Sequence, residues 1–135
     1  MKKIYKLYFV LFLFSCSNIQ TTNEDKETTY YPNGNIKSIV YKKNNILNGQ
    51  AIFYDKNQKI ISISNYKNNL LDGKWVVFYD NGNVKHQLNY KLGLKNGYER
   101  KFYENGKIKY EQEYINDVKT SKTLRYDTDG RIIHK

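Results

Sequence analysis

The stretch Phe78-Tyr79-Asp80-Asn81-Gly82 decides the fold of this chain, because variants of it recur along the sequence. Three turn glycines, Gly82, Gly106 and Gly130, lie 24 residues apart. The same spacing extends back to Gly34, and Gln58 occupies the position between Gly34 and Gly82. A fixed period of this length indicates an array of identical supersecondary units. The other copies are Tyr30-Tyr31-Pro32-Asn33-Gly34, Phe53-Tyr54-Asp55, Phe102-Tyr103-Glu104-Asn105-Gly106 and Arg125-Tyr126-Asp127-Thr128-Asp129-Gly130.

Each unit contains a second turn signal, and these signals are also 24 residues apart: Asn44-Asn45, Asn68-Asn69, Leu92-Gly93 and Asn116-Asp117. Asn, Asp and Gly tolerate the positive φ that two-residue hairpin turns need. The runs between turns are rich in Tyr, Phe, Ile and Val, which favours strands. The sequence therefore predicts an all-β fold, an elongated single-layer antiparallel sheet of β-hairpin repeats with about nine strands from about residue 36 to residue 134.

Side chains alternate along these runs, as expected for strands with one half-buried face. In residues 83–91, Val84, His86 and Leu88 share one face, and Lys85 and Gln87 share the other. Each strand has few Leu, Ile and Val residues, so a compact two-layer core is not expected. Aromatic contacts between neighbouring strands would stabilise the sheet instead, at roughly 0.2–1 kcal/mol per cross-strand pair.

The first residues carry the features of a secretory signal. The chain has 23 Lys and Arg against 13 Asp and Glu, a net charge of +10, and three of its lysines precede the apolar run 7–14. A basic segment followed by a short apolar run is typical of a signal peptide. The run is shorter than the roughly 20 apolar residues that cross a bilayer. Removal of residues 1–15 takes away three lysines and leaves a net charge of +7.

Cys16 is the only cysteine, which excludes an internal disulfide. The tetrapeptide Leu13-Phe14-Ser15-Cys16 resembles the lipobox of bacterial lipoproteins. That resemblance implies that the signal peptide 1–15 is removed, that Cys16 is acylated, and that the lipid holds the protein to a membrane of the cell envelope. An ordinary signal peptide followed by a free thiol is the alternative. The polar residues 16–29 predict a flexible tether, and residues 30–135 form the repeat domain.

The segment from Tyr66 to Gly82, with Trp75 near its middle, is similar to the MORN repeat variant, whose pattern is Y-K-N-x-x-L-x-G-x-W-x-x-F-Y-x-N-G. The resemblance extends over about residues 30–134. Bacterial proteins of this kind are grouped as YwqK-type antitoxins of toxin–antitoxin systems, so it implies a sheet of stacked hairpins that binds a protein, with a toxin as one candidate. Two departures matter: Glu99 stands where the repeat has tryptophan, and an exported chain fits an envelope immunity protein better than a cytoplasmic antitoxin. A single segment, 126–132, is also similar to the YD repeat of Rhs-type shells.

Nothing in the sequence forms a catalytic constellation, so no enzyme activity and no cofactor are expected. His86 lies on the apolar face of its strand, which favours a packed cross-strand residue over a base or a metal ligand. Asp127-Thr128-Asp129-Gly130 begins like a calcium loop, but the later glutamate is missing, so turn chemistry is the preferred interpretation and no metal is expected. Tyrosines and lysines together are typical of nucleic-acid binding. Export argues against that partner.

Two functions remain in competition. The first is binding of a protein partner through exposed aromatic side chains, since Trp and Tyr dominate interface hot spots. Packing within the sheet is an equal alternative for the same residues. The second is an adhesin or scaffold in which lysines bind an anionic envelope polymer or lipid headgroups. The aromatic candidates are Trp75, Phe78, Tyr79, Phe102 and Tyr103, and the lysines are Lys37, Lys42, Lys43, Lys59, Lys67, Lys74, Lys85 and Lys91.

Overall fold

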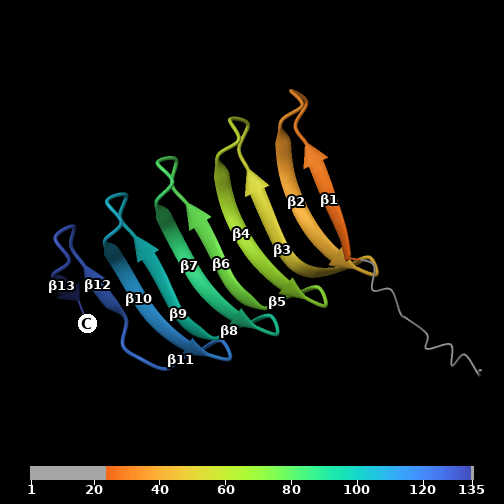
Figure 1. The fold of residues 1–135 in the computed structure, drawn as a ribbon. Coiled ribbons are helices and arrows are strands. Elements are labelled where there is room, and N and C mark those ends of the chain that lie inside the picture. Colours follow the sequence, from red (N-terminus) through yellow and green to blue (C-terminus); the bar gives the residue numbers. More distant parts are fainter. Residues whose placement is uncertain (1–23, 135) are drawn as a thin grey trace, which may run out of the picture.

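A computed structural model describes residues 24–134, and this part of the chain is all-β, as the turn spacing predicts. The strands lie side by side in one open sheet, from β1 in orange to β13 in blue (Figure 1). Within the described residues the sheet has 13 strands. They are β1 (Glu24–Tyr30), β2 (Ile36–Lys43), β3 (Ile46–Tyr54), β4 (Ile60–Lys67), β5 (Leu70–Leu71), β6 (Gly73–Phe78), β7 (Val84–Lys91), β8 (Leu94–Lys95), β9 (Gly97–Phe102), β10 (Ile108–Ile115), β11 (Val118–Lys119), β12 (Leu124–Tyr126) and β13 (Ile132–His134).

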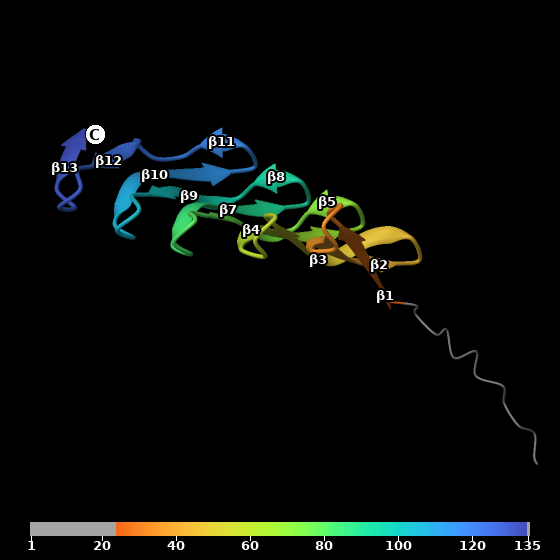
Figure 2. The same cartoon turned by 90° about the horizontal axis from the view of Figure 1, so that it is seen from above.

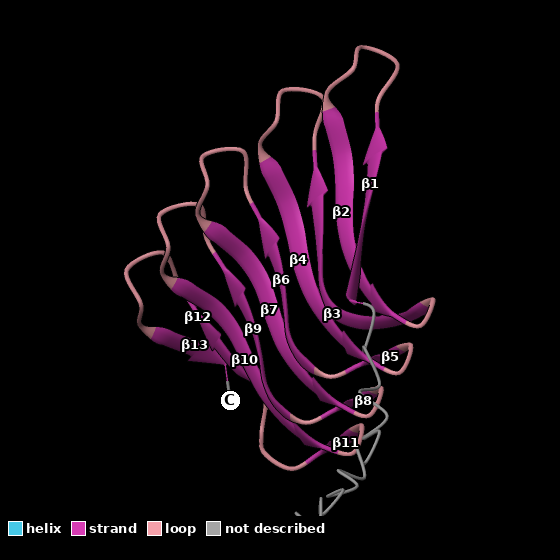
Figure 3. Ribbon diagram, turned by 45° about the vertical axis from the view of Figure 1, so that its right-hand side comes forward, coloured by secondary structure: helices cyan, strands magenta, loops and turns pink. Residues whose placement is uncertain are grey.

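The topology is an antiparallel meander in the order β1-β2-β3-β4-β6-β7-β9-β10-β12-β13. The short strands β5, β8 and β11 pair with β4, β7 and β10 at one end of the hairpins. From Ile36 onward the main path holds the nine strands that the sequence predicts. Seen from above, the sheet is a single twisted layer, and its strands curve along their length (Figures 2 and 3).

Strand β1 corrects the predicted domain boundary. Residues 16–29 read as a tether, but Glu24–Tyr30 pairs with β2 along its whole length. A strand at the edge of a sheet is held by backbone hydrogen bonds and can be polar on both faces. Such a strand lacks the alternation of apolar and polar residues from which strands are predicted. The sheet therefore begins at least six residues before the expected boundary at residue 30. The predicted signal peptide 1–15 and Cys16 lie outside the described residues.

Two faces follow from the strand register, because paired residues project to the same side and successive residues alternate. We define the histidine face by the row Ser38, Phe53, Ser62, Val77, His86, Lys101, Tyr110 and Arg125. We define the isoleucine face by the row Ile39, Ile52, Ile63, Val76, Gln87, Arg100, Glu111 and Leu124.

All buried residues of the described chain project from the histidine face, so the side chains pack more densely on this side of the sheet than on the other. The buried residues are Ser38, Ala51, Ser64, Leu88, Glu99, Gln112 and Tyr114. Only three of these seven are hydrophobic. The expectation that no compact two-layer core forms is therefore confirmed, and cross-strand contacts within one layer carry the packing.

The turns show that two sequence copies are displaced by one residue. Tyr31, Tyr79 and Tyr103 each donate a backbone N–H to the carbonyl four residues later, and Asp55 and Asp127 do the same. Asp55 and Asp127 therefore occupy the slot of the tyrosines, and the alignment of Phe53-Tyr54-Asp55 with Phe78-Tyr79-Asp80 is wrong. Aspartate suits this slot because its carboxylate accepts two backbone N–H groups of the turn, at 2.8 Å each in Asp55.

The glycines in mid-strand are covered by side chains of the neighbouring strand. Gly49 has a φ of +121°, and a Cβ there would lie 3.0 Å from the Cβ of Tyr41. At Gly97 the nearest side-chain atom would be Nδ2 of Asn89, at 3.1 Å. A tyrosine side chain therefore covers Gly49, and an amide side chain covers Gly97.

Candidate functional site

A hollow of about 720 Å³ lies on the histidine face, over the C-terminal half of the sheet. Its wall comes from β7, β9, β10, β12 and β13 and from the turns that begin at Tyr79 and Tyr103. The lining residues are Tyr79, Lys85, His86, Lys101, Tyr103, Lys109, Tyr110, Arg125, Tyr126 and Ile133. Aromatic and cationic side chains dominate this set, and it contains no carboxylate.

Two wall tyrosines join successive repeats through their hydroxyl groups. Tyr79 donates to the carbonyl of Phe102 at 2.8 Å, and Tyr103 donates to the carbonyl of Tyr126 at 2.8 Å. Tyr31 makes the equivalent bond to Tyr54 at 2.7 Å. Each bond crosses to the next turn, so it fixes both the position of the ring and the spacing of the repeats. The rings are therefore rigid walls of the hollow.

Four cations lie against tyrosine rings in the hollow. The ammonium groups of Lys85 and Lys109 lie 5.4 Å and 5.3 Å from the ring centroids of Tyr79 and Tyr103. Lys101 and Arg125 lie at 5.3 Å and 5.8 Å from the ring of Tyr110. Within the described residues, the ion pairs involve none of these four cations. They are oriented by aromatic faces and keep their charge unneutralised.

Lys85 and Lys109 reach the hollow because of β-bulges. Val77 pairs with His86 and Phe78 pairs with Val84, so Lys85 is an extra residue without a partner. Lys109 is the extra residue between Ile108 and Tyr110 in the same way. A bulge re-aims the side chain at the inserted residue. Strict alternation had placed Lys85 opposite His86, and that prediction is wrong, since both line the hollow. It had also placed Val84 on the face of His86, which is wrong because Val84 pairs with Phe78 on the isoleucine face.

Behind the wall lies a buried glutamate. Glu99 is 7% exposed, and its Oε1 lies 2.8 Å from Nε2 of His86. Its Oε2 lies 3.6 Å from Nζ of Lys95. Burial opposes ionisation of Glu99, but the hydrogen bond with His86 and the charge of Lys95 outweigh it, so the pKa of Glu99 is lowered. The ring of Trp75 meets His86 edge to face, with the centroids 5.0 Å apart.

His86 packs against Trp75 and lies on the face of Leu88, as alternation predicts. The sequence did not reveal its partner Glu99. A signal was available, because Glu99 occupies the slot that Trp75 fills one repeat earlier. An acid in a slot that can hold tryptophan indicates a buried carboxylate.

The five predicted partner-binding residues do not form one surface. Trp75, Tyr79 and Tyr103 belong to the histidine face, whereas Phe78 and Phe102 project from the isoleucine face. All five are half-buried, so the premise that they are exposed is wrong. Their role in binding a partner stays a prediction.

The isoleucine face carries an apolar row of which the sequence analysis selected only Phe78 and Phe102. In each repeat an aromatic residue pairs with an aliphatic one across the strands. The five pairs are Tyr30–Ile36, Tyr54–Ile60, Phe78–Val84, Phe102–Ile108 and Tyr126–Ile132. Tyr126 also lies among the residues that line the hollow, so the two surfaces meet at β12. The row of Ile39, Ile52, Ile63 and Val76 runs on the same face. We call these two rows together the apolar band.

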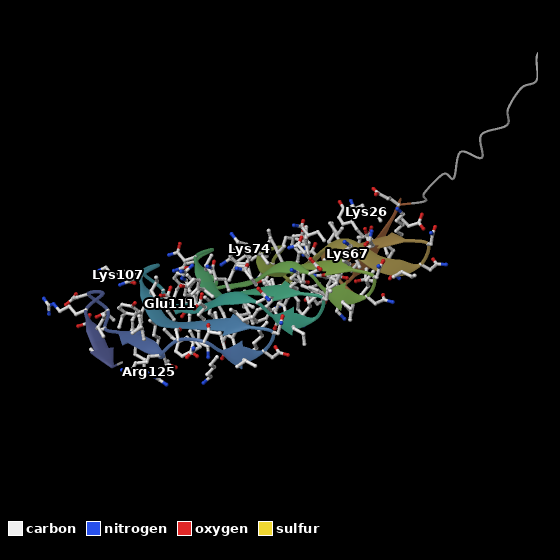
Figure 4. All side chains as sticks on the ribbon, turned by 90° about the horizontal axis from the view of Figure 1, so that it is seen from below. Lys26, Lys67, Lys74, Lys107, Glu111 and Arg125 are labelled. Atoms are coloured by element: carbon white, nitrogen blue, oxygen red, sulfur yellow. The ribbon has the colours of Figure 1, made fainter. Side chains whose placement is uncertain are left out.

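The lysines of the first half do not share one face. Lys74 pairs with Asn89 on the isoleucine side, whereas Lys85 lines the hollow. Lys42 forms an ion pair with Glu27, and Lys59 donates to the carbonyl of Asp80. Figure 4 shows Lys67 and Lys74 over the part of the sheet nearer β1 and Arg125 at the far end. Of the eight lysines named from the sequence, only Lys85 lines the hollow, and the other three cations of its wall come from later in the chain.

Residues 24–134 offer no group of three His, Cys, Asp or Glu side chains that could hold a metal ion. The same residues include no helix long and apolar enough to cross a membrane.

Comparison with protein families finds the MORN repeat variant at residues 26–44, 47–68, 71–92 and 95–116. The chain belongs to the MORN repeat variant family. Each matched segment contains one hairpin of the sheet, and the first begins inside β1, which agrees with the corrected boundary.

No curated protein matches the chain. Among solved structures, an S. aureus TarM mutant in complex with fondaparinux, alpha-GlcNAc-glycerol and UDP is similar, with a TM-score of 0.48 and 16% identity. The match covers 78% of this chain and 21% of the TarM chain, so this chain spans about a fifth of the length of that protein.

Proposed function

We propose that this chain is a non-enzymatic lipoprotein of the cell envelope whose repeat sheet binds a protein partner, in an immunity role against a delivered toxin. The observation that carries the binding proposal is the apolar band on the isoleucine face. Contiguous apolar surface on a soluble domain marks interaction sites. In a single layer no second sheet covers this band within the described residues, and Tyr30, Ile60 and Ile132 are exposed.

The envelope and immunity parts of the proposal rest on the sequence. The tetrapeptide ending at Cys16 supports lipid anchoring, and the resemblance to YwqK-type antitoxins supports a toxin as the partner. An exported, lipid-anchored chain would meet such a toxin at the membrane. The fold itself is compatible with many partners, because function lies in the site that a fold carries.

The chain offers a matched pair of variants to test the apolar band. Ile60 and Ile61 are neighbours with nearly equal exposure, 40% and 42%. Ile60 pairs with Tyr54 in the band, whereas Ile61 occupies the bulge position equivalent to Lys85, on the histidine face. Ile60→Lys and Ile61→Lys therefore add the same charge to opposite faces of one strand.

The experiment is a pull-down from the protein's own envelope, with a lipid-tail-only protein as the background control. We expect one protein to be enriched by the native sheet and by Ile61→Lys and to be lost with Ile60→Lys. Enrichment over background that is equal in both variants would contradict binding through the apolar band. Absence of any enriched protein would contradict the proposal itself.

The cationic hollow favours a second candidate, binding of an anionic envelope polymer or lipid headgroup. Four cations that form no ion pair with residues 24–134 gather on one face, and exposed charge attracts counter-charged ligands in a salt-dependent way. Binding that weakens steeply as salt is raised would support it. Binding that persists in high salt and fails in Ile60→Lys would instead favour the protein partner.

A further inference from the structure

We propose that the hollow on the histidine face is a binding site for a phosphate ester, in which the cations bind the phosphate and the tyrosine rings contact the organic group. This inference sharpens the second candidate function and is independent of the protein partner, which would bind the opposite face. The residues that carry it are Lys85, Lys101, Lys109, Arg125, Tyr103 and Tyr110.

The charge balance of the hollow differs from that of its surroundings. One strand position away, Arg100 is neutralised by Glu111 on the isoleucine face. Lys95 lies near Glu99 behind the wall. The lining contains four cations and no carboxylate, so the hollow has an excess of positive charge that an anion would neutralise. Low-dielectric tyrosine walls strengthen the field of those charges.

The repeats show that folding does not require these cations. The bulge position of Lys85 and Lys109 is held by Ile61 and Ile133 in two other repeats and by Lys37 in the first, all at 24-residue spacing. The position of Lys101 and Arg125 is held by Phe53 and Val77. The same sheet thus accepts apolar residues at both positions. The clustering of cations in adjacent repeats is a property of this site and not of the repeat.

The chemistry of the lining suits phosphate. Lysine ammonium groups act as compact point charges for phosphate, and arginine can donate two hydrogen bonds to adjacent phosphate oxygens. A carboxylate would balance only one of the four cations, whereas a phosphate monoester can carry two negative charges. The volume of about 720 Å³ is within the range for small-molecule sites, about 300–1,000 Å³, so an organic group fits beside the phosphate.

The test uses the full-length chain with Cys16→Ser, so that no lipid anchor interferes, and two probes that share one chemistry. Glycerol 3-phosphate is the soluble ester, titrated by calorimetry. Phosphatidylcholine vesicles with and without phosphatidic acid present a phosphate monoester at a lipid surface and are used in sedimentation. Both assays are run at one fixed salt concentration, because exposed charges are screened.

The decisive variant is the double substitution Lys85→Ile with Lys109→Ile, which copies the residue of other repeats. Lys85→Gln with Lys109→Gln repeats the test without added apolar surface. Lys67→Gln with Lys91→Gln removes the same charge at hairpin ends outside the hollow. Circular dichroism and thermal unfolding check that each variant keeps the sheet.

We expect binding of at least one probe to fall about tenfold for each hollow lysine removed and to change little in the Lys67/Lys91 control. Loss confined to the vesicle assay assigns the ester to a lipid, and loss in both assays assigns it to a soluble ligand. An equal fall in the control would overturn the proposal, because net charge alone would then explain binding. Absence of binding by both probes would overturn it as well. The Ile60→Lys variant should bind the probes normally, so failure of the two proposed surfaces can be told apart.

Discussion

Nε2 of His86 lies 2.8 Å from Oε1 of Glu99, and this contact joins neighbouring strands β7 and β9 at the centre of the sheet. The carboxylate is buried in a layer that has few buried residues at all. A buried charge is tolerated when it is paired and hydrogen-bonded. Here His86 and Lys95 supply the pairing, so both sides of the carboxylate are occupied.

The Glu99 carboxylate should make stability depend on acid pH. Its pKa is lower in the folded chain than the value of 4.5 expected for an unfolded one. The ionised group therefore stabilises the fold above pH 4.5, and this contribution is lost as the pH falls through the folded pKa. We expect Glu99→Gln to lower the free energy of unfolding at neutral pH by about 1–3 kcal/mol.

Urea unfolding measured from neutral to acid pH checks this prediction. The difference between the native chain and Glu99→Gln should shrink as the pH falls below 4.5. Glu104→Gln serves as the control, because Glu104 is exposed in a turn. A difference between the native chain and Glu99→Gln that is constant over the whole pH range would contradict a role for the ionised carboxylate.

The hydroxyl of Tyr103 should stabilise the junction between the last two repeats. Tyr103→Phe removes its hydrogen bond to the carbonyl of Tyr126 and leaves the ring in place. The expected cost is about 1 kcal/mol, the typical net value of one hydrogen bond. Tyr98→Phe is the matched control on an exposed ring that makes no hydrogen bond among the described residues. Equal denaturant midpoints for the two variants would show that the tyrosine bonds between repeats do not contribute.

Gly49 and Gly34 should differ in their tolerance of alanine. Both have positive φ, so alanine at either site strains the backbone, by about 1 kcal/mol. At Gly34 the added Cβ meets nothing within 4 Å, whereas at Gly49 it lies 3.0 Å from the Cβ of Tyr41. We therefore expect Gly49→Ala to lower the thermal midpoint more than Gly34→Ala. Equal thermal midpoints for the two variants would mean that Tyr41 moves aside freely.

The regular spacing of the turn residues made the fold predictable from the sequence. Turn residues at a constant spacing set the strand number and the order of pairing, because short turns leave each strand only its chain neighbour as a partner. Strand β1 escaped prediction, since backbone hydrogen bonds at a sheet edge require no apolar pattern. The slots of Asp55 and Asp127 were misread because aspartate and tyrosine support the same turn by different chemistry.

The candidate site was less predictable for a physical reason. Alternation placed His86 correctly, but it fails where a bulge inserts a residue, as at Lys85 and Lys109. The hollow also combines side chains from strands that are neighbours only after folding. Residue types at one position therefore indicate the face, whereas the assembly of cations around Tyr110 depends on register across four strands.

The anchor prediction concerns a residue outside the described part of the chain. If Cys16 is acylated, Cys16→Ser should move the protein from the membrane fraction to the soluble fraction of the cell. Lysis followed by fractionation measures this directly, with Ser15→Ala as a control that keeps a small residue before the cysteine. Retention of Cys16→Ser in the membrane fraction would show that the lipobox interpretation is wrong.

The two proposed surfaces should act independently, because they lie on opposite faces of a single layer. Substitutions that share no contacts are usually additive. Adding Ile60→Lys to the Lys85→Ile/Lys109→Ile double variant should therefore lose both protein capture and phosphate-ester binding, each by the amount seen with its own substitutions. Saturating glycerol 3-phosphate should leave protein capture by the native sheet unchanged. A pull-down repeated with and without the ester measures this, and competition between the two ligands would mean that the partner covers the histidine face.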